Sequence, residues 1–147
     1  MKLFLDTSTL FKLYHQETGS EFVDSLFSNF PVKEVFLSEI TKVEFASTAW
    51  KKFRVREITE EQVMGMLASF ENDLKKYTFL QIDNMVIEHA KQLFAKYGSQ
   101  GLRALDSIQF STALLLNTYA DLFVTSDKLL EIFFKQEGLP TENPQSL

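Results

Sequence analysis

Five acidic residues occupy positions that solvation of a polar helix face does not explain: Asp6, Glu44, Asp83, Asp106 and Asp127. Asp6, Asp83 and Asp127 each follow a short apolar run typical of a buried strand, and the carboxyl ends of parallel strands share one edge of a sheet. Glu44 and Asp106 lie near the starts of predicted helices, on or beside the apolar face. Carboxylates that gather together repel one another unless a cation neutralises them. The pattern therefore points to a divalent-metal site.

Each of these acids also has a purely structural interpretation. Asp83 is placed to cap the helix that follows it, and Asp6 and Asp127 could act as caps too. An acid inside a helix, near an apolar stripe, needs a partner, and Arg103, one turn before Asp106, is a candidate. Local sequence leaves the choice between helix cap and cation ligand open.

Residue composition narrows the chemistry that such a site could support. The chain has no cysteine and only two histidines, so a zinc site, which favours those ligands, is poorly supported. Carboxylate oxygens select magnesium, manganese or calcium instead. A net charge of −5 argues against binding nucleic acid through the whole surface, but not against a local basic patch. The most basic stretch, residues 51–56, is either a solvated helix end or a contact for RNA or for an acidic partner.

The elements that must position these acids alternate along the chain. Helices are expected between successive strands, with two in a row between the second and third strands. This order predicts one domain over residues 1–147, of class α/β, with three layers and a four- to five-stranded, mostly parallel sheet. The strands are expected at residues 3–5, 35–37, 79–82 and 122–124, with an edge strand added by the tail after residue 138.

Two of the expected helices carry acids beside an apolar stripe. We predict that the helix over residues 38–53 buries Ile40, Val43, Ser47 and Trp50. In the helix over residues 101–116, the predicted stripe is Leu105, Ile108, Thr112 and Leu115. A further helix begins at a capping box formed by Thr59 and Gln62.

The chain is expected to act away from membranes. No stretch approaches the ~20 apolar residues that a membrane span needs. An acid at position 6 comes too early for the apolar region of a signal peptide. The absence of cysteine fits a cytoplasmic protein.

Four segments, LFLDTS, LSEITKVEF, LRALDSIQ and FVTSDKLL, occur in this order between about residue 2 and about residue 144. Together they resemble the PIN domain, in particular the VapC-type toxins of prokaryotic toxin–antitoxin pairs. The resemblance implies an acidic quartet of Asp6, Glu44, Asp106 and Asp127 that holds one or two Mg²⁺ or Mn²⁺ ions. Asp6 and Asp106 would bind the principal ion, and Glu44 and Asp127 would assist or position the water.

The same resemblance implies an activity and partners. The expected activity is that of a metal-dependent endoribonuclease that hydrolyses phosphodiester bonds in RNA. The expected partners are a cognate antitoxin protein and a second copy of the chain in a homodimer. Thr7, Thr125 and Ser126 would supply hydroxyl groups near the acids, and Arg103 a contact to phosphate.

Two alternatives remain open at this stage. A non-catalytic PIN-like module would bind RNA or protein only, although the complete acidic quartet argues against it. A receiver-type phosphoacceptor domain would use Asp83 as acceptor, with Thr125 and Lys128 assisting. A single acid after the first strand, rather than an adjacent pair, argues against the receiver.

Overall fold

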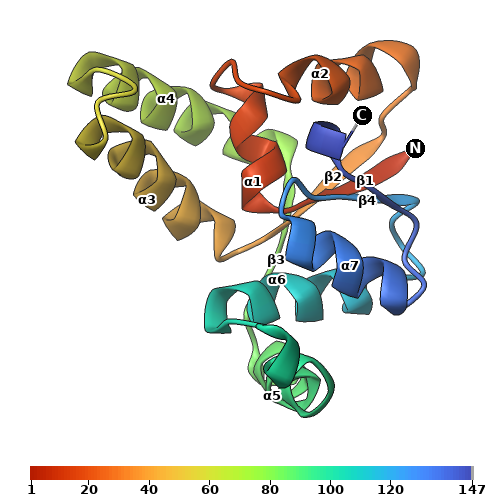
Figure 1. The fold of residues 1–147 in the computed structure, drawn as a ribbon. Coiled ribbons are helices and arrows are strands. Elements are labelled where there is room, and N and C mark those ends of the chain that lie inside the picture. Colours follow the sequence, from red (N-terminus) through yellow and green to blue (C-terminus); the bar gives the residue numbers. More distant parts are fainter. Residues whose placement is uncertain (147) are drawn as a thin grey trace.

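The centre of the molecule is a parallel five-stranded sheet, shown in Figure 1 as a computed structural model in which residues 1–146 are described. The strands pair in the order β3-β2-β1-β4-β5, and each pairing is parallel, so the predicted sheet is confirmed. Since β2 and β4 lie on opposite sides of β1, a crevice is expected at the carboxyl ends of β1 and β4. The strands are β1 (Lys2–Leu5), β2 (Glu34–Ser38), β3 (Thr78–Leu80), β4 (Leu122–Val124) and β5 (Thr141–Glu142).

Helices and short 3₁₀ turns connect the strands, and α3 and α4 stand in succession between β2 and β3 as predicted. None of the helices in residues 1–146 combines the length and the apolar character needed to cross a lipid bilayer. The helices are α1 (Thr7–Leu10), α2 (Ser20–Asn29), α3 (Thr41–Arg54), α4 (Glu60–Asp73), α5 (Asn84–Tyr97), α6 (Ala104–Leu115) and α7 (Lys128–Gln136). The 3₁₀ turns are η1 (Phe11–Leu13), η2 (Leu74–Lys76), η3 (Gly98–Gln100) and η4 (Pro144–Ser146).

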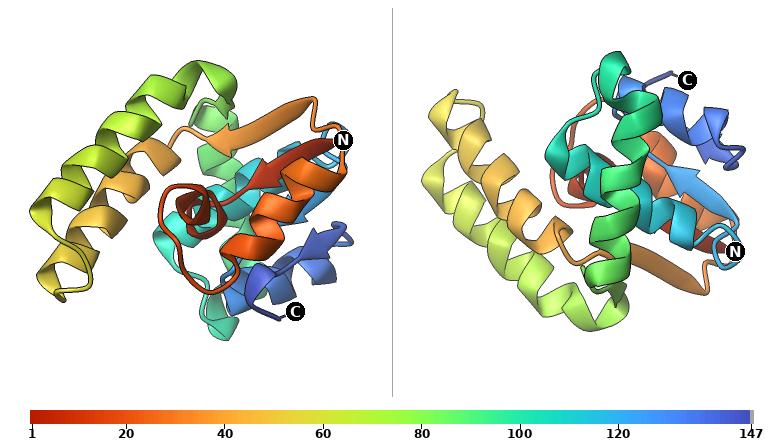
Figure 2. Two further views of the ribbon diagram at one scale, coloured as in Figure 1. Left: turned by 90° about the horizontal axis from the view of Figure 1, so that it is seen from above. Right: turned by 90° about the horizontal axis from the view of Figure 1, so that it is seen from below.

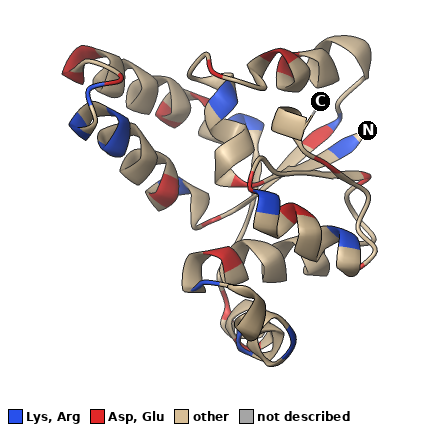
Figure 3. Cartoon of the chain, in the orientation of Figure 1, with Lys and Arg blue, Asp and Glu red and all other residues tan. Residues whose placement is uncertain are grey.

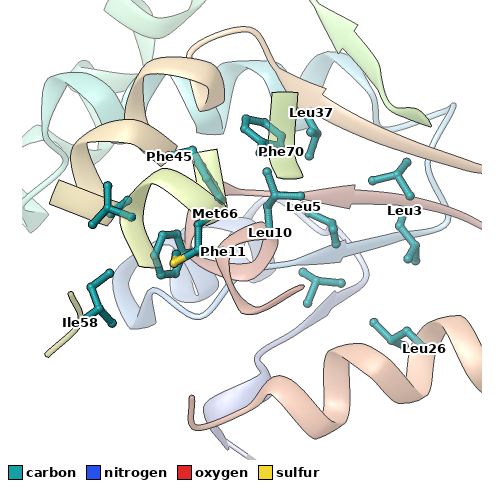
Figure 4. Packing of buried hydrophobic residues seen from close by; sticks show 14 residues of the cluster. Leu3, Leu5, Leu10, Phe11, Leu26, Leu37, Phe45, Ile58, Met66 and Phe70 are labelled. Atoms are coloured by element: carbon teal, nitrogen blue, oxygen red, sulfur yellow. The ribbon is translucent and has the colours of Figure 1, made fainter. Parts of the chain in front are cut away.

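Alternating side chains of β1 enter two hydrophobic cores on opposite faces of the sheet. Leu3 and Leu5 pack with Phe11 in the core that is covered by α1, α2, α3 and α4 (Figure 4). Phe4 points the other way and packs against Phe134, with ring centroids 6.2 Å apart, in the core beneath α5, α6 and α7. Helices on both faces of the sheet make the predicted three-layer α/β/α architecture.

Helices α3 and α4 form a hairpin that extends away from the sheet (Figures 1 and 2). The second helix begins at the predicted capping box, in which Thr59 and Gln62 exchange hydrogen bonds. Packing of Phe45 against Phe70, with ring centroids 4.4 Å apart, holds the two helices together near the sheet. This contact fixes the part of α3 that carries Glu44.

The predicted buried face of α3 is wrong. Val43 is 66% exposed, whereas Thr41, Phe45 and Ala49 are buried. Ser38, expected to be the cap of this helix, is instead the last residue of β2, and the helix begins only at Thr41. The helix carries apolar residues on several of its faces, and the contacts of Phe45 with other aromatic rings decide which face is buried.

The predicted face of α6 is also largely wrong. Leu105 is 51% exposed, while Ser107, Gln109 and Phe110 are buried along with the predicted Thr112. Helix α6 lies between the sheet and α5 (Figures 1 and 2), so it is enclosed on two sides rather than one. Enclosure of this kind buries polar residues that a single-stripe pattern assigns to solvent.

Candidate active site

A cavity of about 400 Å³ opens at the carboxyl ends of β1 and β4. Asp6, Glu44, Asp106 and Asp127 all line it. Asp6 directly follows β1, and Asp127 is the N-cap of α7 after β4, while the two others lie in the first turns of α3 and α6. The tertiary structure thus brings the four residues of the predicted quartet to one crevice, where the order of the strands reverses.

The fifth acid, Asp83, lies outside this cavity. It is the N-cap of α5, and its Oδ1 accepts a hydrogen bond from the backbone N–H of Val86 at 3.0 Å. It follows β3, the strand at the outer edge of the sheet, two strands away from the crevice. Asp83 is therefore a helix cap, and the receiver-type alternative has no acceptor in the cavity.

Asp6 is both a helix cap and a part of the cavity wall. Its Oδ1 accepts hydrogen bonds from the backbone N–H of Thr9 at 3.1 Å and from Ser8 Oγ at 2.7 Å. Its Oδ2 accepts a hydrogen bond from Thr125 Oγ1 at 2.6 Å. Burial raises the pKa of Asp6 to about 6, although the hydrogen bonds from Thr125 and Ser8 act in the opposite direction. Hydrogen bonds thus fix the Asp6 carboxyl group at a buried position, and burial disfavours its ionised form.

Glu44 is oriented by two donors from other elements. Its Oε1 accepts hydrogen bonds from Thr7 Oγ1 and from Gln109 Nε2, each at 2.8 Å. The same amide nitrogen lies 3.1 Å from the hydroxyl oxygens of Thr7 and Thr41, so Gln109 links α6 to α1 and α3. The Oε1 atom of Gln109 is buried without a hydrogen-bond partner among residues 1–146. Such an orphaned acceptor in a cavity wall is available to a water molecule or to a hydrated ion.

Asp106 lies close enough to Asp127 for the charge of Asp127 to affect its pKa. Partial burial is the main cause that raises the pKa of Asp106, followed by the negative charge of Asp127. The predicted partner, Arg103, opposes this shift only from the rim, with its Nε 3.8 Å from Asp106 Oδ2 and its side chain 85% exposed. Asp127 in turn caps α7 by accepting a hydrogen bond from the backbone N–H of Leu130 at 2.9 Å.

The three predicted hydroxyl residues all lie close to the acids. Thr7 donates to Glu44, and Thr125 donates to Asp6. Ser126 lines the cavity, and its Oγ is buried without a hydrogen-bond partner within the described chain. The hydroxyls of Thr7 and Thr125 orient carboxylates but carry no charge that could neutralise them.

The donors present fit a hydrated divalent cation. In residues 1–146, no three His, Cys, Asp or Glu side chains stand close enough to hold one ion jointly. Mg²⁺, however, usually binds one or two carboxylates and keeps several waters. The buried oxygens of Gln109 and Ser126, which lack protein partners, are suited to bind those waters. That the acids hold one or two such ions stays a prediction.

Sequence reasoning missed several residues of the cavity wall. Gln109 lies one turn after Asp106, and a polar residue at that spacing was a usable signal, but the wrong face was assigned to α6. Lys12, Glu17 and Lys52 also line the cavity. Of these, only Lys52 was singled out, as part of the basic stretch over residues 51–56.

The family model of the PIN domain matches residues 3–132 of the chain. The chain is a PIN domain. No curated protein matches this PIN domain in a sequence comparison.

Several solved structures share this fold. FitAcB from Neisseria gonorrhoeae is 19% identical, with 99% of each chain covered and a TM-score of 0.72. VapC20 from Mycobacterium tuberculosis, a toxin that cleaves the sarcin–ricin loop, is 14% identical, with 93% of this PIN domain and 95% of that chain covered and a TM-score of 0.68. VapBC2 from Rickettsia felis, bound to a DNA fragment from its promoter, is 19% identical, with 97% and 98% covered and a TM-score of 0.64. At these identities the similarity establishes the fold.

Proposed function

We propose that this PIN domain is a magnesium- or manganese-dependent endoribonuclease that hydrolyses phosphodiester bonds in RNA. One observation carries the proposal: four carboxylates from separate segments line one cavity, where hydroxyl and amide groups orient two of them, Asp6 and Glu44. Helix capping alone would account for Asp6 and Asp127, but not for Glu44 and Asp106 in the wall of the same cavity. Their arrangement instead favours a bound cation.

The proposed mechanism assigns each acid a task. A bound Mg²⁺ would supply a Lewis acid that lowers the pKa of its water and neutralises charge on the scissile phosphate. Asp6 and Asp106 would hold that ion, since both are disfavoured as free carboxylates by burial. Glu44, oriented through Oε1, keeps Oε2 available to accept a hydrogen bond from the attacking water. Asp127 would assist from the start of α7.

We further propose that the protein is the toxin of a toxin–antitoxin pair, with a cognate antitoxin as partner, and that it forms a homodimer. Support comes from the structures with the same fold, which include FitAcB, VapBC2 and a toxin–antitoxin complex from Klebsiella pneumoniae. The RNA-cleaving toxin VapC20 supports RNA as the class of substrate.

The test compares Asp6→Asn with a matched control, Asp83→Asn. Both acids follow strands and cap helices, but only Asp6 lines the cavity. With Mg²⁺ and a panel of structured RNAs, Asp6→Asn should lose about a hundredfold or more in cleavage rate, because metal stabilisation of the transition state amounts to several kcal/mol. Asp83→Asn should cleave like the wild type, and EDTA should abolish cleavage by both.

Two results would contradict this assignment. Mg²⁺-dependent cleavage at the wild-type rate by a folded Asp6→Asn variant would remove Asp6 from the active site. A wild type that binds RNA but cleaves none of the panel with Mg²⁺ or Mn²⁺ would favour the non-catalytic module.

A further inference from the structure

The cavity has a second wall that, unlike the acidic one, carries ammonium groups. Lys12 of η1 and Lys52 of α3 line it, together with Glu17 (basic segments are blue in Figure 3). Glu17 bridges the two ammonium groups, with Oε1 3.0 Å from Lys12 Nζ and Oε2 3.4 Å from Lys52 Nζ. Lys52 Nζ is also 3.0 Å from Glu57 Oε2. Two ammonium groups, each paired with a carboxylate, thus converge at one end of a cavity that holds the carboxylates of the acidic quartet at the other.

Lys12 is an unusual lysine because its side chain is only 2% exposed. Burying an ammonium group is costly unless it is paired and hydrogen-bonded. Within the described chain its Nζ donates one hydrogen bond to a side chain, that of Glu17, although an ammonium carries three N–H donors. Lys12 therefore keeps donors for a further acceptor in the cavity.

Helix α3 joins the two ends of the cavity. Glu44, Thr48 and Lys52 follow one another at intervals of four residues, and all three line the cavity. Eight residues of α-helix span about 12 Å. This length exceeds the ~3.4 Å rise between successive phosphates of a stacked strand. The cavity therefore extends over more than one nucleotide of a bound strand.

We propose that Lys12 and Lys52 form a subsite that binds a backbone phosphate of the RNA next to the one that is cleaved. The inference rests on the proposed nuclease function and deepens it. The scissile phosphate would lie at the acidic end, where a metal ion must screen it from the carboxylates. The flanking phosphate would lie at the basic end, where two ammonium groups bind it directly. This subsite positions RNA in a protein whose overall charge of −5 does not attract it.

The ion pairs around Lys52 keep the subsite charged. Partial burial lowers the pKa of Lys52, but the hydrogen bond with Glu57 and the charge of Glu17 outweigh this, so the pKa lies above its ordinary value. In the RNA-free protein, Glu17 occupies the position between the lysines that a phosphate oxygen would take. Neutralising Glu17 should therefore free both lysines for phosphate.

The experiment measures binding of a short fluorescent single-stranded RNA by anisotropy, with Ca²⁺ in place of Mg²⁺, between 50 and 200 mM KCl. Lys52→Gln should weaken binding about fourfold near 0.15 M salt and reduce the slope of log K against log salt by about 0.7, the change expected for one lost phosphate contact. Lys51→Gln is the matched control: it removes the same charge from the next residue, which is exposed and does not line the cavity. Its slope should equal that of the wild type.

Glu17→Gln separates phosphate binding from a merely structural ion pair. It should bind the RNA more tightly than the wild type, because the lysines lose their competing carboxylate. Equal slopes for Lys52→Gln and Lys51→Gln, or weaker binding by a folded Glu17→Gln, would overturn the subsite. Since the readout is binding, these outcomes are distinct from an absence of cleavage, which would overturn only the nuclease.

Discussion

The two walls of the cavity differ in how their charged side chains are paired. On the basic wall, Glu17 pairs with Lys12 and Lys52 at 3.0 and 3.4 Å, so the protein neutralises its own charges. On the acidic wall, carboxylates meet hydroxyl groups, an amide and one another. Among the described residues, the only cation within salt-bridge distance of these acids is Arg103, which lies at the rim with its Nε 3.8 Å from Asp106 Oδ2.

The paired charges of the basic wall stabilise the fold, whereas the clustered carboxylates of the acidic wall serve function. A carboxylate beside an ammonium group lowers the free energy of the folded state, or at least offsets the cost of burial. Carboxylates beside one another raise it, and such an arrangement persists where function needs it. The acidic wall is therefore expected to reduce stability until a cation binds, and the basic wall to maintain it.

Neutralising one acid on each wall and measuring unfolding by urea in EDTA tests whether the two walls differ in this way. Burial raises the pKa of Asp6 to about 6, so the folded state binds its proton more tightly than the unfolded state. Ionised Asp6 thus lowers the free energy of unfolding above pH 6, by at most about 3 kcal/mol, and this loss is recovered as the pH falls toward 4. Asp6→Asn should raise stability by about 1–3 kcal/mol at pH 7.5, and by less at pH 4.5. Glu17→Gln should instead lower it by about 1–2 kcal/mol, because buried Lys12 loses its partner.

Opposite signs for these two variants are the essential outcome. If both substitutions shift stability in the same direction at pH 7.5, the two walls do not differ in the way the contacts indicate. Asp83→Asn serves as the control for exchanging a capping carboxylate for an amide, since Asp83 caps a helix outside the cavity.

A smaller effect is expected for Gln109→Leu, which removes the amide donor to Glu44 but keeps the approximate volume. Loss of groups that orient metal-binding side chains typically costs 10–100-fold in metal affinity or activity. The variant should therefore require more Mg²⁺ for half-maximal cleavage, which a Mg²⁺ titration at fixed RNA measures. Gln81→Leu, at an exposed position, should leave the titration unchanged. An unaltered Mg²⁺ requirement in Gln109→Leu would show that Glu44 does not depend on this donor.

The smallest effect is expected for Arg103→Ala. The pair with Asp106 is long and the arginine is 85% exposed, so its removal should change the free energy of unfolding by less than about 0.5 kcal/mol. A urea titration compares it with the wild type. A loss well above 1 kcal/mol would mean that the acidic wall has an effective counter-charge after all.

Much of the fold followed from local pattern. Each apolar run of the sequence became a strand within a residue or two, and the capping box at Thr59 starts α4. Five acids stood out because acids at strand ends, and beside helix faces, are conspicuous against their neighbours, and the resemblance to the PIN domain selected four of them as the quartet. Gln109 and Lys12 were missed since an uncharged amide, or a lysine in a short helix, has no unusual local context.

The buried faces of α3 and α6 could not be read from periodicity. Val43 and Leu105 are apolar and fit a helical stripe, yet both are exposed. Phe45 packs against aromatic rings from η1 and α4, and these contacts join residues far apart in the sequence. Periodicity describes one helix, whereas burial depends on what surrounds it.

The order of the elements, the parallel sheet and the acids near its strand ends could be predicted without a structure, because these depend on neighbouring residues and on the rules of β–α–β connection. The sequence left open whether Asp6 caps a helix or faces a cation. The tertiary structure shows that it caps α1 and also lines the cavity. Only the fold could decide between these two roles of Asp6. Only the fold could also place Lys12, Glu17 and Lys52 opposite the acids, because the pairing of charges depends on distances between segments that local sequence does not encode.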